Sequence, residues 1–421
     1  GKLALTQAER ALKISVDPSK GGMPQPCSEF ALHDELPLIK ELYDAGELSF
    51  FANAGVINTA TMDKTNYNIV TRTQLFAHNM MQYEAKTVDP YSNAPGTGVL
   101  GRLAEILTDK GYSTNSLSID DPSVALVSPR EGDSPRPLTA KRSGASRFYE
   151  RAPDDASRVT EMIDYVAKLN NRTDTDVSDP YSSNFFGDAW SERLMTGIPQ
   201  ANRFATALAG TTLRSSWSNA DNSEPTDKLS MIARLLQTHV DCGVDRDFFY
   251  AQYGGWDHHE DMKEKIRPKF AALNEALSLF RDELATQGLW NEVTIVVTSD
   301  FGRTLTPNGN IGSDHAWGGH YFALGGAVKG GTIHGKYPDD LTETGPLNLG
   351  RGRIMPTTSW DSLWNAVAEW MGNQTMTDAD LDYCLPNREN VVGNGFADMF
   401  RASDLFRDGG ATRKLRQGRF S

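Results

Sequence analysis

Carboxylate and imidazole side chains gather in three short stretches in the second half of the chain. Asp257 and His259 lie in the first stretch, Asp300 in the second, and His315 in a third that is rich in glycine. Imidazole nitrogens and carboxylate oxygens are the ligands that zinc, manganese and similar divalent cations take, and glycines let the backbone bend such ligands inward. The residue types therefore predict a metal centre. The alternative is an ordinary surface region, in which Asp257 caps a helix and the histidines face solvent.

The first two stretches follow elements that resemble neighbouring strands of one sheet. Residues 247–253 have the pattern of a strand, residues 266–284 that of a long amphipathic helix, and residues 293–297 form a β-branched run typical of a parallel strand buried on both faces. In such strand–helix–strand units, ligands bind beyond the carboxyl ends of the strands. Asp257 and Asp300 are thus predicted to face one crevice.

The first third of the chain alternates helical and strand-like patterns, which favours an α/β fold with helices on the faces of a sheet. Helices are predicted over residues 36–43 and after Gly98, and strands over residues 48–52 and 118–127. Further on, the glycine-rich segment 325–331 predicts a tight hairpin.

Changes in composition divide the chain into four parts. Residues 1–127 form the first part of the α/β domain, 128–228 an inserted or cap region rich in Ser, Pro, Arg and Asp, 229–372 the second part with the site motifs, and 373–421 a carboxy-terminal extension. We expect the inserted region to be irregular, with helical stretches.

Composition excludes several classes of protein. With 421 residues, 39% apolar and 23% charged, the chain has the make-up of a folded globular protein. Its 42 Lys and Arg against 55 Asp and Glu give a net charge of −13, which repels nucleic acids and anionic lipid surfaces. The apolar runs fall far short of the roughly 18 residues of a membrane helix. We therefore expect no nucleic-acid partner and no membrane span.

The cysteines and glycosylation sequons are the features of the sequence that bear on the cellular compartment. The three cysteines, Cys27, Cys242 and Cys384, are far apart and predict neither a disulfide framework nor a zinc-binding spacing. Asn171 and Asn373 each begin an Asn-x-Thr sequon, which is compatible with a secreted glycoprotein. The expectation is a secreted, cell-surface or periplasmic protein.

Four ordered blocks of the sequence resemble a known family. They are Tyr-Gly-Gly-Trp-Asp-His-His, Val-Val-Thr-Ser-Asp-Phe-Gly-Arg-Thr, Asn-Gly-Asn-Ile-Gly-Ser-Asp-His-Ala-Trp-Gly-Gly-His-Tyr-Phe and Leu-Gly-Gly-Ala-Val-Lys-Gly-Gly-Thr-Ile-His-Gly-Lys-Tyr-Pro. They are similar to the domain of unknown function 1501 family, which is placed in the alkaline phosphatase and sulfatase superfamily. The resemblance continues at residues 32–37, 75–79 and 381–388, so it covers nearly the whole chain.

This resemblance implies a fold. It is a three-layer α/β/α sandwich with a mostly parallel sheet, as in alkaline phosphatase, here with the inserted region. Relatives begin with a strand that ends in Gly-Gly-x-Asp, and nothing before Leu32 matches it. We therefore expect the first strand to be missing from this chain.

The resemblance also implies roles for individual residues. The metal-binding motifs of the family fall on Asp257, His259, Asp300 and His315. His258 lies at a variable position between two of these ligands, outside the ligand set.

The remaining candidates surround these ligands. Asp314 is expected to orient the loop of its neighbour. Arg303 and His320 are candidates for contact with an anionic substrate, and His78 joins them as a catalytic candidate. Ala77 occupies the position at which many relatives have Ser, so no nucleophile is assigned; Thr73 lies nearby, where a hydroxyl is more often a helix cap.

The resulting hypothesis is a metal-dependent hydrolase of phosphate or sulfate esters, acting on a small-molecule or glycan ester. Its divalent ion is expected to be zinc, with manganese, calcium and iron as alternatives. The rival hypothesis is a catalytically degenerate family member that serves as an extracellular or surface assembly protein and self-associates. A third reading, a phosphomutase or phosphoglycan transferase, shares the fold.

Overall fold

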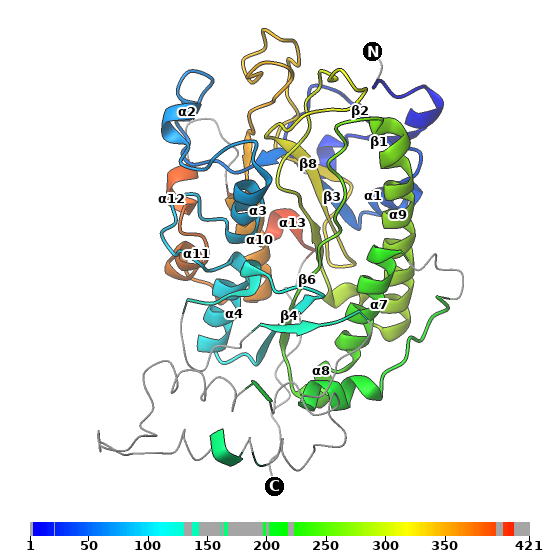
Figure 1. Cartoon of the computed structure of the whole chain (residues 1–421), viewed down its shortest axis with the longest axis vertical. Helices are drawn as coiled ribbons and strands as arrows, with labels where there is room; N and C mark the ends of the chain where they lie inside the picture. Colours follow the sequence, from blue (N-terminus) through cyan, green and yellow to red (C-terminus); the bar gives the residue numbers. More distant parts are fainter. Residues whose placement is uncertain are drawn as a thin grey trace.

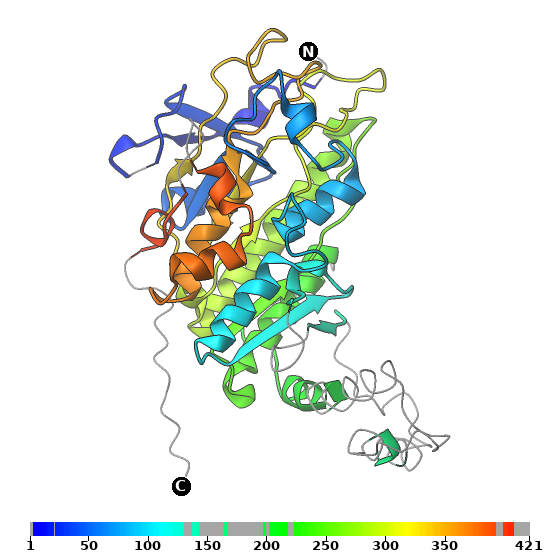
Figure 2. The ribbon, with the colours of Figure 1, turned by 90° about the vertical axis from the view of Figure 1, so that its left-hand side faces the viewer.

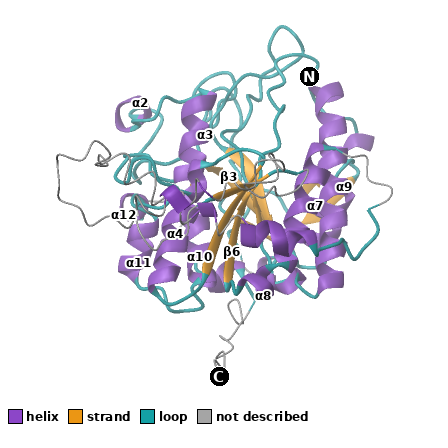
Figure 3. Cartoon of the chain, turned by 60° about the horizontal axis from the view of Figure 1, so that its bottom comes forward, coloured by secondary structure: helices purple, strands orange, loops and turns teal. Residues whose placement is uncertain are grey.

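The computed structural model describes residues 3–20, 22–129, 137–142, 161, 164–166, 197–198, 202–217, 223–392 and 399–407. Most of the predicted inserted region, including Asn171, lies outside these residues. The strands form a middle layer between two groups of helices (Figure 1, Figure 3). In the ribbon turned by 90° the helices again cover the strands, and the described part of the chain is an α/β structure (Figure 2).

The described strands are β1 (Leu12–Ser15), β2 (Glu29–Leu32), β3 (Leu48–Gly55), β4 (Thr114–Ile119), β5 (Leu138–Ala140), β6 (Arg246–Tyr250), β7 (Ile295–Val297), β8 (Gly319–Leu324), β9 (Thr332–His334) and β10 (Thr358–Ser359). The described helices are α1 (Pro37–Asp44), α2 (Tyr67–Val70), α3 (His78–Thr87), α4 (Val99–Asp109), α7 (Glu224–Gln237), α8 (His239–Cys242), α9 (Met262–Gln287), α10 (Trp360–Met371), α11 (Asp378–Cys384), α12 (Arg388–Val391) and α13 (Ala402–Leu405).

The strands form three sheets. One has the order β10-β3-β8-β7 with β9 also paired to β3, a second has the order β5-β4-β6, and β1 and β2 form a separate antiparallel pair. The larger sheet is mixed, because β8 runs antiparallel to both β3 and β7. Among its described strands, β3, β7, β9 and β10 share one direction and β8 opposes them, while the pairs of the three-stranded sheet are parallel. The alkaline phosphatase-like sandwich stays a prediction. A loop and no described helix joins β7 to β8, and such a connection returns the chain antiparallel.

Several predicted elements are confirmed, with shifted ends. The helices after residue 36 and after Gly98 are α1 and α4, the long amphipathic helix is α9, and the strand after residue 48 is β3. The predicted strand over residues 118–127 is wrong beyond Ile119, because Asp120 adopts a positive φ of 72° and turns the chain. The predicted hairpin at residues 325–331 is also wrong, because β8 and β9 both pair with β3 and not with each other.

Side chains on the two faces of the strands pack into two different hydrophobic clusters. From β3, Phe51 packs in the cluster with α4 and α10, whereas Leu48 and Ala52 pack in the cluster with α1, α7 and α9. β8 divides in the same way between Tyr321 and Leu324. This period of two fixes which face of each strand meets which group of helices.

Among the described residues, none of the helices combines the length and the apolar character that a membrane crossing requires.

Candidate metal centre

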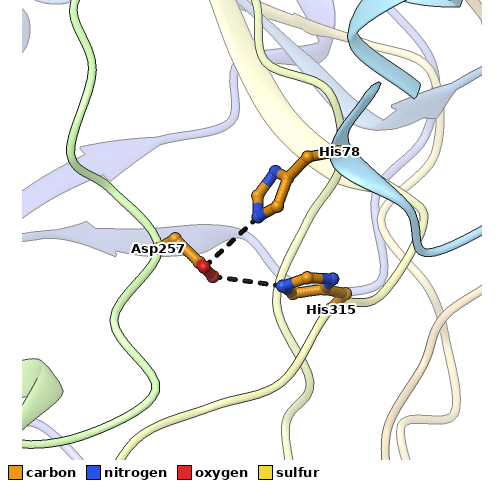
Figure 4. A group of neighbouring side chains, drawn as sticks. All are labelled: His78, Asp257 and His315. Carbon is orange, nitrogen blue, oxygen red and sulfur yellow. Dashed lines mark hydrogen bonds and ion pairs between the residues drawn. The ribbon is translucent and has the colours of Figure 1, made fainter. Parts of the chain in front are cut away.

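Four separate elements bring the candidate residues together. Asp257 lies in the loop after β6, Asp300 is the third residue after the end of β7, and His315 lies in the glycine-rich loop between β7 and β8. His78 is the first residue of α3. Figure 4 shows the rings of His78 and His315 directed at the carboxylate of Asp257.

The carboxylate of Asp257 is the centre of this cluster. Its Oδ1 lies 2.9 Å from Nε2 of His259 and 3.1 Å from Nε2 of His315, and its Oδ2 lies 3.3 Å from Nε2 of His78. Ligand atoms of His78, Asp257 and His315 all lie within 4.8 Å of one another. The spacing is compact enough for one ion to touch all three side chains.

The Nδ1 atom of each histidine ring forms a hydrogen bond with an oxygen atom outside the cluster. Nδ1 of His78 lies 2.6 Å from Oδ2 of Asp300, and Nδ1 of His259 lies 3.2 Å from Oδ1 of Asp314. Nδ1 of His315 lies 2.7 Å from the carbonyl oxygen of Phe76. Ionised carboxylates and carbonyls only accept hydrogen bonds, so each Nδ1 carries a proton and donates it.

The hydrogen bonds made by Nδ1 determine which form of each ring, with or without a proton on Nε2, faces Asp257. A neutral imidazole with its proton on Nδ1 presents a lone pair at Nε2, so three lone pairs converge on a carboxylate that also has only lone pairs to offer. Protonation of the rings would place like charges side by side, whereas a cation between them would accept these lone pairs. Histidine ligands of metals show this pattern of an outer acceptor on the second nitrogen. The residues present therefore fit a divalent metal ion.

Among the described residues, Arg303 brings a positively charged guanidinium into contact with the carboxylate of Asp257. Its Nη1 donates to Oδ1 of Asp257 at 2.5 Å, and its Nε donates to Oγ of Ser313 at 3.1 Å. Burial alone would raise the pKa of Asp257, but the hydrogen bond and the charge of Arg303 outweigh it, and the pKa is lowered to about 2. Asp257 is thus fully ionised at neutral pH.

The charged side chains around the cluster balance one another. Three carboxylates and three guanidinium groups contact it or its supporting loops: Asp257, Asp300 and Asp314, and Arg303, Arg351 and Arg353. Their formal charges cancel, so a divalent cation would make the site positive. This local balance differs from the acidic character of the whole chain.

Two of the predicted residues lie side by side at the cluster. Asp300, predicted as a ligand, lies beside His78, and its Oδ1 accepts hydrogen bonds from Ser299 Oγ at 2.8 Å and from the backbone N–H of Phe301 at 3.1 Å. His78, predicted as a catalytic residue, lies among the possible ligand atoms. Both predicted roles stay predictions.

His320 lies apart from this cluster. Its Nδ1 accepts a hydrogen bond from the backbone N–H of Asn53 at 3.1 Å, and its ring stacks on Tyr337 with the ring centroids 4.9 Å apart. It borders a cavity, toward which its side chain is exposed. No contact of the described residues joins it to Asp257, so its predicted substrate contact stays a prediction.

Two other residues named from the sequence also face away. The His258 side chain is buried at 8% exposure, and its backbone carbonyl accepts from Ser313 N–H. Thr73 donates its hydroxyl hydrogen to Oε1 of Glu84 at 2.9 Å, and Ala77 at the start of α3 has no side-chain cap. At the start of α3, none of the residues Phe76–Asn79 carries a hydroxyl.

Three supporting residues were not singled out from the sequence. Phe76 has a positive φ of 65°, and its carbonyl receives the Nδ1 proton of His315. Asn308 donates to Oδ1 of Asp314 at 3.2 Å, and Arg351 donates to the other oxygen of Asp314. Phe76 is next to Ala77 in a block that resembles the family, and this proximity is the signal that was available.

A comparison with protein families gives one further finding. The family described as "Protein of unknown function (DUF1501)" matches residues 63–346, which is more than half of the chain and includes the whole cluster. No curated protein and no solved structure matches the chain.

Proposed function

The chain belongs to the DUF1501 family of proteins of unknown function, and we propose that it is a metal-dependent hydrolase of phosphate or sulfate esters with an alkaline phosphatase-like fold. The observation that carries this proposal is the convergence of three Nε2 lone pairs, from His78, His259 and His315, on the carboxylate of Asp257. A binding scaffold has no need for such a set of ligands.

We assign the metal to these four residues, with zinc as the first candidate because of the three imidazole nitrogens. A divalent cation held there supplies a Lewis acid that polarises a phosphoryl or sulfuryl oxygen and lowers the pKa of bound water. Asp300, Asp314 and the carbonyl of Phe76 keep the three rings in the tautomer and orientation that this requires.

Two features of the chain suit an anionic substrate. Arg303 borders the cluster beside Asp257, and a guanidinium can donate to two oxygens of a phosphate or sulfate group. The first turn of α3, which starts at His78 and has no side-chain cap, leaves backbone N–H groups free to favour negative charge. Because Ala77 offers no hydroxyl, we assign the nucleophile to water.

The proposal is tested by elemental analysis of the protein purified without chelator, followed by assays on aryl phosphate and aryl sulfate esters. We expect stoichiometric metal in the native chain and a large loss in His315→Ala. His239→Ala, a histidine replacement on α8 outside the cluster, serves as the matched control. A well-folded native protein without metal would contradict the proposal and favour the assembly-protein hypothesis.

The ester hydrolysis assay requires a control that separates activity at this site from activity elsewhere. Ester hydrolysis that disappears in His259→Ala and remains in His239→Ala would support the assignment. Activity that survives His259→Ala would belong to another site or to a contaminant.

A further inference from the structure

Arg353 lies beside the proposed metal centre, and no step of the proposed hydrolysis uses it. Its Nε donates to the carbonyl oxygen of His315 at 3.1 Å, and its guanidinium carbon lies 4.8 Å from the centroid of the Phe76 ring. The carbonyl of Phe76 in turn accepts from Nδ1 of His315. Arg353 is therefore joined to a proposed ligand in two ways, directly through the backbone of His315 and indirectly through Phe76.

The turn that carries Arg353 is held by backbone hydrogen bonds. The N–H of Arg353 donates to the carbonyl of Gly350 at 3.2 Å, and the carbonyl of Arg353 accepts from Leu349 at 2.9 Å. The next residue, Ile354, accepts from the N–H of Gly318 at 2.9 Å, which ties the turn to the start of β8. Because recognition needs side chains on a well-held backbone, Arg353 is suitably placed to bind a ligand.

The two terminal nitrogens of Arg353 are open. Within the described ranges neither Nη1 nor Nη2 has an acceptor, and no carboxylate forms an ion pair with this side chain. Neither nitrogen is buried away from solvent, so a ligand can reach both.

The other two guanidinium groups near the centre are already paired. Arg303 forms an ion pair with Asp257, and Arg351 forms one with Asp314. Arg353 differs from them, because it offers a planar pair of donors with an uncompensated positive charge. This arrangement binds a carboxylate, sulfate or phosphate through two oxygens.

The position of Arg353 decides which anionic group it can bind. His315 faces Asp257 with Nε2, whereas Arg353 contacts His315 at its backbone carbonyl and also contacts Phe76, whose carbonyl faces Nδ1. An ester group at the centre is met by Arg303, which contacts Asp257 itself. Arg353 therefore lies to one side of the centre, where it meets a different part of the same substrate.

The surroundings of Arg353 do not depend on the first strand that we expect to be missing. Such a strand could belong in the cavity that β6 and β7 line, and neither Arg353 nor Phe76 borders that cavity. On the turn itself, the carbonyl of Gly352 accepts from the N–H of Leu305, whose side chain is 49% exposed. An apolar surface for the organic part of a substrate is thus available next to Arg353.

We propose that Arg353 binds a second anionic group, a carboxylate, sulfate or phosphate, on the organic part of the ester. The substrate is then an ester with two anionic groups, one at the metal centre and one at Arg353. Because this contact exists in the ground state and in the transition state alike, it lowers KM and leaves kcat unchanged. The inference rests on the proposed hydrolase function and names the kind of substrate that it takes.

The experiment measures the binding of phosphonates, which are not hydrolysed, to the protein purified without chelator. Phenylphosphonate carries one anionic group, and ortho-, meta- and para-carboxyphenylphosphonate carry a carboxylate in addition. By isothermal titration calorimetry we expect at least one of these isomers to bind the native chain about 10- to 100-fold more tightly than phenylphosphonate, as for a hydrogen-bonded charge pair. Benzenesulfonate and its carboxy derivatives form a second series, for a centre that prefers sulfate.

Arg353→Gln is the matched variant. The Nε2 of glutamine stands at the same place along the side chain as the Nε of arginine, so it can still donate to the carbonyl of His315. The variant lacks Nη1, Nη2 and the positive charge. We expect the preference for the carboxylated ligand to disappear, while the affinity for phenylphosphonate and the metal content stay unchanged. With the corresponding carboxyphenyl phosphate, KM should rise and kcat should not change.

Arg281→Ala is the control variant. It removes an arginine of α9 from its ion pair with Glu41 and should keep the full preference for the carboxylated ligand. The comparison of two ligands on one protein also separates recognition from damage, because a distorted centre would weaken both ligands alike.

Two outcomes would overturn this inference and leave the hydrolase proposal standing. One is a native chain that binds phenylphosphonate and its carboxylated isomers equally, a result that needs no variant. The other is a preference for the carboxylated ligand that persists in Arg353→Gln, since the second group would then be bound elsewhere. Failure of every ligand in both series to bind would contradict the hydrolase proposal as well.

Discussion

The Nε2 atoms of His259 and His315 lie 3.0 Å apart, and each also lies within 3.1 Å of Oδ1 of Asp257. Since both rings donate from Nδ1 to acceptors outside the cluster, neither has a second proton to place between them in its neutral form. Two lone pairs in such contact require a positive charge nearby. Under the proposed metal assignment, the outer acceptors of the rings therefore matter as much as the residues that would face an ion.

Asp300→Asn tests this dependence on outer acceptors. Asp300 accepts from His78 Nδ1 through one oxygen and from Ser299 and Phe301 through the other, and an amide can accept through only one of its two terminal atoms. We expect metal affinity to fall about 10- to 100-fold, the usual effect of losing an outer partner of a ligand. Competition with a fluorescent chelator measures it.

Asp282→Asn, at an exposed position on α9, is the matched control and should bind metal like the native chain. Unchanged affinity in Asp300→Asn would mean that His78 is not a ligand.

Arg303→Ala tests the proposed contact with substrate. We expect kcat/KM for an aryl phosphate or sulfate to fall by about 100-fold, comparable with the loss of one hydrogen-bond donor to a transition state, while the metal content is retained. Arg281→Ala removes an arginine from an ion pair with Glu41 and should leave kcat/KM unchanged. If Arg303→Ala and Arg281→Ala had the same kcat/KM, Arg303 would serve only to hold the loop through Ser313.

Hydrophobic spacing and glycine positions correctly predicted those helices and strands whose structure depends on their own local sequence. α9 shows this, because its apolar residues repeat with helical spacing and the left-handed Gly288 at φ 76° ends it. The stretches with Asp257 and Asp300 were likewise recognised, since each follows a run with the pattern of a strand. These features depend on neighbours in the sequence.

Contacts between segments that lie far apart in the sequence could not be predicted from these local patterns. β8 and β9 both pair with β3, and no property of the glycine-rich segment between them distinguishes that arrangement from a hairpin. The same holds for the site: His78 and Asp300 are joined by a hydrogen bond across 222 positions of the sequence. Their contact depends on the packing of α3 against the loop after β7, which is a tertiary effect.

The positive φ of Phe76 gives a prediction about stability. An L residue at φ 65° is strained, and glycine is not. Phe76→Ala and Phe76→Gly both lose the ring that packs under Arg353, so their difference reports the backbone alone. We expect Phe76→Gly to be more stable than Phe76→Ala by up to about 1 kcal/mol in urea unfolding.

The same comparison inside α3 should have the opposite sign. Ala85 lies within this helix, where Gly costs about 1 kcal/mol relative to Ala, so Ala85→Gly should destabilise the protein. If Phe76→Ala were at least as stable as Phe76→Gly, the left-handed conformation of Phe76 would not be a source of strain.

Glu84 on α3 predicts a dependence of stability on pH. Its side chain is 3% exposed, and Oε2 has no hydrogen-bond partner among the described residues. Burial raises the pKa of Glu84 to about 7, although the hydrogen bond from Thr73 acts in the opposite direction. The folded state therefore holds the proton more tightly than the unfolded state, whose carboxyl has the ordinary pKa of 4.5. Stability is lost as pH rises from about 4.5 through 7, and the loss is complete above that range.

Glu84→Gln removes this loss, because the amide is neutral at every pH and its oxygen can still accept from Thr73. We expect the variant to exceed the native chain in free energy of unfolding by about 2 to 3 kcal/mol at pH 8, and by much less at pH 5. Urea unfolding at both pH values measures the difference, with Glu275→Gln on α9 as the control. A variant that is less stable than the native chain at pH 8 would show that Glu84 is ionised and stabilised in the fold by a partner other than Thr73.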